Sequence, residues 1–148
     1  MKYMKLFMKN FHNIKIRKNT LWILSYFTDG DSDQIQRILD LDPCQKIFES
    51  LKFDDKEIRA AALRTVGNFL TGEDDQAEEL IRKGVIGHLA PFLDDTSKAL
   101  RKEACWAFSN IMAGDETQVE KVFRYSKGRI VKKLFQMISS DEPDVRKL

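Results

Sequence analysis

The sequence predicts an all-α protein in which one helical unit is repeated along the chain. Glycine and proline number only 7 and 3 among 148 residues, and no stretch shows the alternation of apolar and polar residues that is typical of strands. Landmark residues recur at a constant step of 42 positions. Apolar residues, which make up 43% of the chain, follow the same step, so each unit has an apolar face for its neighbour.

The 42-residue step holds from position 16 to position 123 without a gap. The matched triplets are Arg17, Arg59 and Arg101; Gly30, Gly72 and Gly114; Gln34, Gln76 and Gln118; Ile16, Ile58 and Leu100; Phe27, Phe69 and Ile111; and Ile38, Leu80 and Val122. A step of 45, from Arg101 to Arg146, predicts an insertion near 124–128. Helical units of about 40–47 residues are typical of armadillo and HEAT repeats, which stack into a solenoid. We therefore expect a right-handed armadillo-repeat superhelix.

The repeat register divides the single array, residues 1–148, into units. Two complete three-helix units are expected at 31–72 and 73–114, with partial units at 1–30 and 115–148. The helices of the second complete unit are expected at about 74–82, 86–93 and 98–112. Gly84 should interrupt the chain, residues 94–97 should form a turn, and Gly114 should be the C-cap of the third helix. In the partial units, residues 5–10 are typical of a second helix and residues 145–148 of the first turn of a third.

Charge is distributed unevenly along the chain. Residues 1–28 hold six basic residues and no acid, whereas the remainder holds 19 basic and 23 acidic residues. An acidic body disfavours nucleic acid as a partner and favours a cationic one. No apolar run approaches the roughly 20 residues of a membrane span, and the N-terminus lacks the apolar core of a signal peptide. We expect neither a nucleic-acid nor a membrane partner.

The cysteines and histidines form no recognisable site. Cys44 and Cys105 are 61 residues apart, and His12 and His88 complete no zinc-binding spacing. Two reduced thiols are the simplest interpretation. Nothing in the sequence orients Cys105 toward His88 as a nucleophile and base, and no glycine-rich phosphate loop is present. We predict a protein without catalytic residues, bound metal or cofactor.

The third helix of each unit carries a stripe of polar and aromatic residues beside its buried face. The stripe consists of Asn19, Trp22 and Tyr26 in the first helix, Ala61, Arg64 and Asn68 in the next, and Glu103, Trp106 and Asn110 in the last. The predicted buried face of the last helix is Leu100, Ala104, Ala107, Phe108 and Ile111. A core position could not alternate between tryptophan and arginine without burying an unpaired charge. The stripe should therefore face solvent or a partner.

The residue types of the stripe suit an extended peptide. Neighbouring helices lie about 8–10 Å apart and an extended peptide advances about 3.3 Å per residue, so each unit covers two or three peptide residues. An asparagine carboxamide can hold a peptide backbone, and a tryptophan face can pack the stem of a lysine or arginine. Acids at the helix ends would favour cationic side chains, and helix capping explains several of them equally well. These acids are Asp29, Asp31, Glu73, Asp74, Asp115 and Glu116.

Three segments carry a family resemblance. They are "LWILSYFTDGDSDQIQRIL" (21–39), "ALRTVGNFLTGEDDQ" (62–76) and "IRKG" with "RKEACWAFSNIMAG" (within 81–114). On these segments the chain resembles the importin-α (karyopherin-α) family, the armadillo-repeat adaptors of nuclear import, over about residues 14–147. The arginine in a tryptophan position, Arg64, resembles the central repeats of that family.

The resemblance implies a concave groove that binds basic nuclear localisation signals of cargo proteins, in the cytoplasm and nucleus. The peptide-binding positions would be Trp22, Tyr26, Arg64, Asn68, Thr71, Gly72, Glu103, Trp106 and Asn110, with acidic specificity from Asp29, Glu73 and Asp115. Trp22 and Trp106 would pack lysine stems, and the two asparagines would hold the peptide backbone. Asn19 stands where an acid is expected. Residues 1–18 hold one arginine, so the importin-β-binding segment of the family is expected to be absent.

Other functions stay open beside this one. A different armadillo or HEAT scaffold, of the β-catenin kind, would have the same fold with another partner. A truncated import receptor would have the stripe without binding cargo. The residue pattern does not support an enzymatic function. The repeated tryptophan and asparagine positions favour the transport adaptor, since a generic scaffold has no reason to repeat them.

Overall fold

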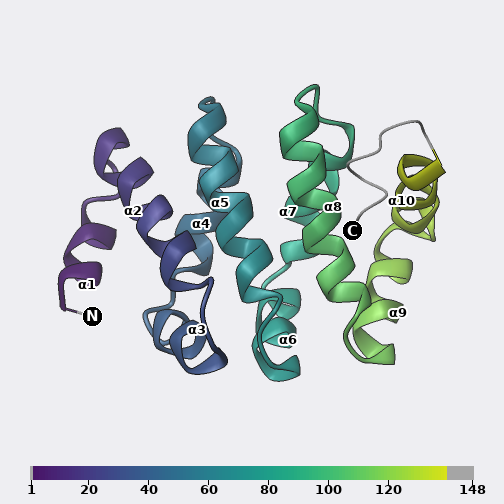
Figure 1. Ribbon diagram of the computed structural model, residues 1–148, viewed down its shortest axis with the longest axis horizontal. Coiled ribbons are helices and arrows are strands. Elements are labelled where there is room, and N and C mark those ends of the chain that lie inside the picture. Colours follow the sequence, from purple (N-terminus) through teal and green to yellow (C-terminus); the bar gives the residue numbers. More distant parts are fainter. Residues whose placement is uncertain (1, 140–148) are drawn as a thin grey trace.

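The computed structural model describes residues 2–139, which form ten α-helices and one 3₁₀ helix (Figure 1). They are α1 (Lys2–Lys9), α2 (Ile14–Phe27), α3 (Ser32–Leu39), α4 (Cys44–Leu51), α5 (Lys56–Phe69), α6 (Asp74–Arg82), α7 (Val85–Leu89), η1 (Ala90–Asp94), α8 (Lys98–Met112), α9 (Glu116–Ser126) and α10 (Arg129–Ser139). No strand occurs in this range, and none of its helices is long and apolar enough to span a bilayer. The all-α prediction is confirmed.

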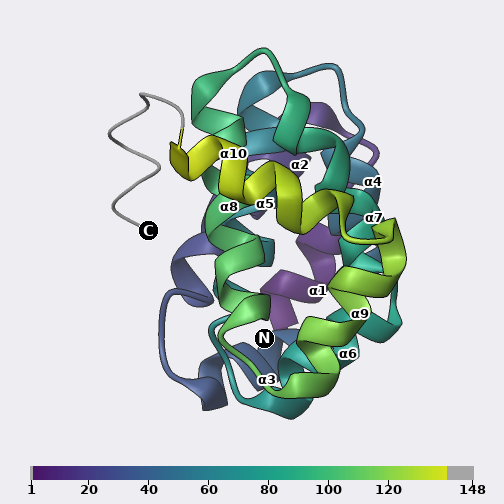
Figure 2. The same ribbon diagram turned by 90° about the vertical axis from the view of Figure 1, so that its right-hand side faces the viewer.

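The helices stack in three ranks along the long axis of the molecule (Figure 1). Helices α2, α5 and α8 lie side by side in the front rank, α4 and α7 lie behind them, and α3, α6 and α9 line one edge. Helix α5 packs on α2, α4 and α8. Figure 2 looks along the stack from the C-terminal side and shows α10 lying across its end. This arrangement is the armadillo-repeat solenoid, in which successive units contribute equivalent helices to each rank.

The buried face predicted for the third helix is confirmed. The fully buried side chains of α8 include Leu100, Ala104, Ala107, Phe108 and Ile111. Burying one leucine, isoleucine or phenylalanine stabilises a fold by about 1.5–3 kcal/mol, so this face holds α8 in the stack. The matched position Phe69 of α5 is also buried, whereas Phe27 at the end of α2 remains 51% exposed.

A glutamine side chain packs closely over the glycine that lies two or three residues after the end of each front-rank helix. A Cβ atom at Gly72 would lie 2.2 Å from Oε1 of Gln76, which folds back over the glycine and accepts from a backbone N–H three residues before it. The same approach, at 2.1 Å in each case, occurs at Gly30 and Gly114. The prediction that Gly114 is the C-cap was wrong, because α8 ends at Met112 and Ala113 is its C-cap.

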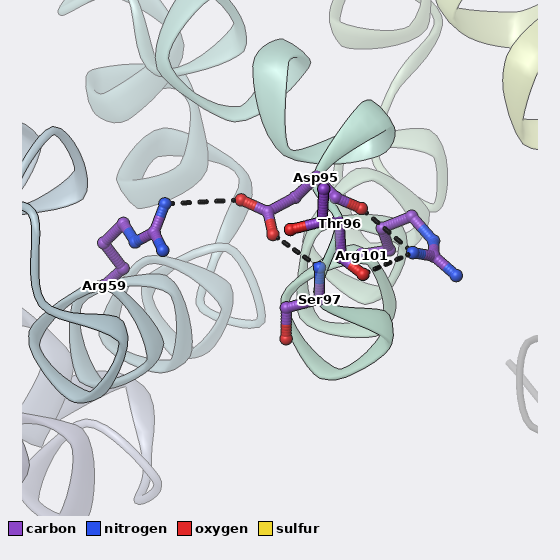
Figure 3. Close-up of polar contacts among 5 residues, drawn as sticks. All are labelled: Arg59, Asp95, Thr96, Ser97 and Arg101. Atoms are coloured by element: carbon purple, nitrogen blue, oxygen red, sulfur yellow. Dashed lines mark hydrogen bonds and ion pairs between the residues drawn. The ribbon is translucent and has the colours of Figure 1, made fainter.

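The turn predicted at residues 94–97 is shorter in the structure, because Asp94 is the last residue of η1. The remaining residues, 95–97, are held from two helices (Figure 3). Asp95 Oδ1 accepts from the backbone N–H of Ser97 at 2.7 Å. Arg101 of α8 donates to the C=O of Asp95 at 2.9 Å, and Arg59 of α5 donates to Asp95 Oδ2 at 3.4 Å. Two of the arginines matched by the 42-residue step therefore position the start of α8.

The second helix of the last complete unit differs from the prediction. Residues 85–94 form α7 and then the tighter turns of η1, where a single helix at 86–93 was expected. Pro91 lies at the start of η1, and proline cannot donate the backbone hydrogen bond that would continue an α-helix. Gly84 does interrupt the chain, with a φ of 88° between α6 and α7.

The predicted insertion near 124–128 corresponds to a longer α9. The end of α6 at Arg82 matches Arg124 in the repeat register, whereas α9 continues to Ser126. The helix expected at residues 5–10 is α1, which begins earlier, at Lys2. The helix turn expected at 145–148 lies outside the described residues.

Candidate functional site

A shallow groove of about 310 Å³ crosses the front rank. Its lining comes from α2, the segment that follows α2, α5 and α8. It consists of Trp22, Ser25, Tyr26, Asp29, Lys56, Ala60, Arg64, Asn68, Ala99, Leu100 and Glu103. Six of these residues were predicted as site residues from the sequence. The groove thus brings together the stripe residues of three successive helices, because the 42-residue step places them on the same face of each.

One half of the groove is open. Tyr26 is 76% exposed, and Asp29 is exposed just beyond the end of α2. Trp22 packs partly on the core and presents the rest of its side chain to the groove. An aromatic face, a phenol and a carboxylate are therefore available together to a ligand.

The other half of the groove is occupied by a contact between α5 and α8. The Arg64 guanidinium donates to both carboxylate oxygens of Glu103, with Nε to Oε2 at 2.9 Å. Its central carbon lies 5.4 Å from the centroid of the Trp106 ring. The indole in turn covers the backbone of α5, since a Cβ atom at Gly67 would lie 2.2 Å from its Cζ3. Glu103 and Trp106 are both partly buried by this packing.

The asparagines of the stripe are used within the fold. Asn68 is only 2% exposed, which corrects the expectation that this position faces solvent. Its Nδ2 donates to the C=O of Ser25 at 2.7 Å and to Thr28 Oγ1 at 3.3 Å. Asn110 is partly exposed and donates to the C=O of Gly67 at 3.1 Å. Both carboxamides thus bridge neighbouring helices of the front rank.

These bonds belong to a series in which each unit donates to backbone carbonyls of the unit before it. The series comprises Asn68 to Ser25 at 2.7 Å, Asn110 to Gly67 at 3.1 Å, Gln76 to Ser32 at 2.9 Å and Gln118 to Asp74 at 3.1 Å. Each donor lies 43 or 44 residues after its acceptor. The polar residues repeated at the 42-residue step therefore align successive units.

The remaining predicted residues lie at helix ends and outside the groove. Thr71 Oγ1 donates to the C=O of Asn68 at 2.7 Å, and Glu73 precedes α6 as its N-cap. Asp115 is the N-cap of α9, where the Thr117 hydroxyl and the backbone N–H of Gln118 lower the pKa of its carboxyl. Helix capping therefore explains Glu73 and Asp115, and neither acid requires a ligand as its explanation.

Sequence reasoning did not assign Lys56 and Ala60 to the groove. They lie eight and four residues before Arg64 on α5, and Asn68 lies four residues after it. Residues spaced by four share one face of a helix, so extending the stripe by this rule would have found them. The consequence for the site is that a second cation, Lys56, lines the groove together with the acids.

The described residues contain no group of three or more histidine, cysteine or acidic side chains that could hold a metal ion. Cys44 and Cys105 are free thiols and both are buried. Burial raises the pKa of Cys44 to about 11, so this thiol is a poor nucleophile near neutral pH. His88 stacks on Phe48, with 4.6 Å between the ring centroids, and Cys105 contacts Met137. His88 and Cys105, the pair considered as base and nucleophile, therefore each pack against another side chain.

Comparison with known proteins supports the repeat architecture. A family model described as HEAT-like repeat matches residues 56–111. No curated protein sequence matches the chain. A designed armadillo repeat protein in complex with the peptide (KR)4 has a similar structure, with a TM-score of 0.89 and 23% identity over 97% of this chain and 60% of its own. Computationally designed armadillo repeat proteins for modular peptide recognition are also similar, with a TM-score of 0.86 and 24% identity over 97% of this chain and 58% of theirs.

The fold is a helical-repeat solenoid of the armadillo/HEAT type. An engineered protein with a TM-score of 0.87 and 21% identity, matched over 99% of this chain and 59% of its own, has the same architecture. The chain therefore spans about 60% of the length of these structures. At such identities the similarity establishes the armadillo-repeat solenoid, and the ligand has to be argued from the groove.

Proposed function

We propose that this chain is a non-catalytic scaffold that binds extended basic segments of other proteins in the groove across α2, α5 and α8. The observation that carries the proposal is the open half of the groove, where Trp22, Tyr26 and Asp29 are grouped. An aromatic face beside a carboxylate suits one lysine or arginine side chain. The stem of that side chain packs on the ring while its charge is attracted by the acid.

The charges of the groove favour recognition by contact over long-range attraction. Asp29 and Glu103 are offset by Lys56 and Arg64 in the same lining, and Glu103 is already paired. An exposed ion pair contributes up to about 1 kcal/mol, and an exposed cation–π contact about 0.5–1 kcal/mol. We therefore expect weak binding with a modest dependence on salt, in which the aromatic contacts are as important as the acids.

We further propose that the ligands are nuclear localisation signals and that the chain takes part in protein import, in the cytoplasm and nucleus. The order of stripe residues, with Arg64 between Trp22 and Trp106, supports this through its resemblance to importin-α. The complex of a similar designed protein with (KR)4 supports a basic ligand. The alternative is a scaffold with another peptide class. The structural comparisons support that broader function more directly, because the similar structures are designed binding proteins.

A binding titration with matched tyrosine variants tests the proposal. The probe is a fluorescently labelled (Lys-Arg)4 peptide, titrated with the full chain at low and at physiological salt and followed by anisotropy. Tyr26→Ala removes a ring from the open half of the groove and should weaken binding severalfold. Tyr125→Ala, which removes a ring that is 58% exposed on α9, is the control and should leave binding unchanged.

The outcomes separate the proposed functions. Saturable binding that only Tyr26→Ala weakens supports the basic-peptide groove. Equal loss in both variants points to non-specific attachment. If the folded chain binds (Lys-Arg)4 no better than an uncharged Gly-Ser peptide of equal length, the ligand is not basic and the broader scaffold function stands alone. A localisation-signal peptide that binds more tightly than (Lys-Arg)4 would favour the import role.

A further inference from the structure

The middle tryptophan position of the front rank holds Arg64, and this arginine reaches from α5 to the next helix. It makes a two-point ion pair with Glu103 and lies over the Trp106 ring at 5.4 Å. Carboxylate and indole are the two groups that would bind a cationic side chain of a peptide at α8. The chain therefore presents its own guanidinium where a ligand cation would bind.

We propose that Arg64 is an internal ligand of the cation site formed by Glu103 and Trp106, and thereby a specificity-determining residue of the groove. The proposal rests on the function proposed above. A bound peptide would place its cationic side chain at Trp22 and would have to displace Arg64 to place another at Trp106. The groove is thus selective for peptides with a single anchoring cation over peptides that need both sites.

The Trp22 site shows the difference between a filled and a free position. The residue matching Glu103 in the first unit is Asn19, so no acid precedes Trp22 by one turn. Within residues 2–139 the cation–π contacts pair Arg64 with Trp106 and Arg17 with two phenylalanines, and none involves Trp22. The acid near Trp22 is Asp29, which is exposed. Among residues 2–139, therefore, no cation makes a cation–π contact with the Trp22 ring, although Lys56 lines the same groove.

The strength of the competition follows from exposure. The Arg64 side chain is 51% exposed and Glu103 is 19% exposed, so water already competes for the pair and Arg64 can be displaced without unfolding. An exposed ion pair together with one cation–π contact corresponds to about a tenfold change in an equilibrium constant. Removal of Arg64 should therefore raise the affinity for a multiply basic peptide about tenfold.

The test compares two variants that each lose one cation and one ion pair between neighbouring units. Arg64→Ala frees Glu103 and Trp106. Lys121→Ala breaks the ion pair with Glu78, away from the groove, and controls for the change in net charge. With labelled (Lys-Arg)4 as the probe, Arg64→Ala should bind about tenfold more tightly than the wild type and Lys121→Ala within about twofold of it. Adding Trp106→Ala to Arg64→Ala should abolish the gain, because the vacated site then has no ring.

The results distinguish the inference from the function on which it rests. Binding by the wild type that Arg64→Ala leaves unchanged or weakens overturns the internal-ligand role and keeps the peptide-binding function. A gain that persists after Trp106→Ala, or that Lys121→Ala reproduces, overturns it as well, since the effect is then one of net charge. Binding by Arg64→Ala alone, with none by the wild type, supports the internal-ligand role and contradicts the proposed function of the natural chain. Absence of binding in every folded variant refutes both.

Discussion

Replacing Asn68 by alanine tests whether its carboxamide is a structural link or a group kept for a ligand. The side chain is 2% exposed, and its Nδ2 donates to the C=O of Ser25 and to Thr28 Oγ1. Its removal leaves that C=O with the Thr28 hydroxyl at 3.4 Å as its remaining side-chain donor, and leaves the space of the amide unfilled. A buried polar group that loses its partner costs about 1–3 kcal/mol. We expect Asn68→Ala to lower the free energy of unfolding by about 2 kcal/mol.

Urea and thermal unfolding followed by far-ultraviolet circular dichroism would measure this loss. For a chain of this size, about 2 kcal/mol corresponds to a decrease in Tm of about 4–8 °C. The matched variant is Asn110→Ala, which removes one bond of 3.1 Å from a partly exposed side chain and should cost about 1 kcal/mol. If Asn68→Ala unfolds like the wild type yet no longer binds the basic peptide, the structural explanation is refuted and the carboxamide is a ligand group.

Three further variants or conditions test other features of the fold. Gly67→Ala should displace the Trp106 indole and shift tryptophan emission to the red. It should destabilise the chain by about 1–2 kcal/mol, although alanine favours a helix by about 1 kcal/mol over glycine. Unchanged emission would contradict the contact between the indole and Gly67. Burial lowers the pKa of His88, so the unfolded chain takes up the proton first and stability should fall as the pH drops below about 6.5. His88→Phe should reduce that decline in urea titrations at pH values from about 7 to 5, and an identical decline would assign it to other groups. The Cys44 thiol, with a pKa of about 11, should react with DTNB at about pH 8 only after unfolding, so rapid reaction of the native chain would argue against its burial.

The architecture could be predicted from the sequence because the buried apolar residues recur at the 42-residue step. Apolar residues aligned by the 42-residue step, such as Ile58 with Leu100 and Leu80 with Val122, are all fully buried in equivalent helices. The same step placed the stripe on one face, and so located the groove. Helix ends were less predictable. Gly114 lies one residue after the C-cap Ala113, where the Gln118 amide packs over it, and its backbone is not left-handed.

The partners of the polar residues could not be predicted from the sequence. Arg64 and Glu103 are 39 residues apart, and only the packing of α5 on α8 brings them together. An asparagine donates equally well to a ligand and to a neighbouring helix. The residue type of Asn68 therefore predicted a donor, and only the structure shows that its acceptor is in α2. The repeat of Arg17 at the 42-residue step likewise did not predict what the residue does. In the structure Arg17 donates to the C=O of Phe11 at 2.8 Å, six residues before it. Arg101 donates in the same way to the C=O of Asp95, six residues before it.

The one-way series of hydrogen bonds between units has a consequence for how such a chain can evolve. Each unit brings its own amide donors, and what it requires of the preceding unit is a set of main-chain oxygens, which any helix of that geometry supplies. A gene duplication that copies one whole unit therefore creates a junction in which these main-chain hydrogen bonds are already matched. Repeat number can change by such steps while the surface residues of each copy diverge independently toward new ligands.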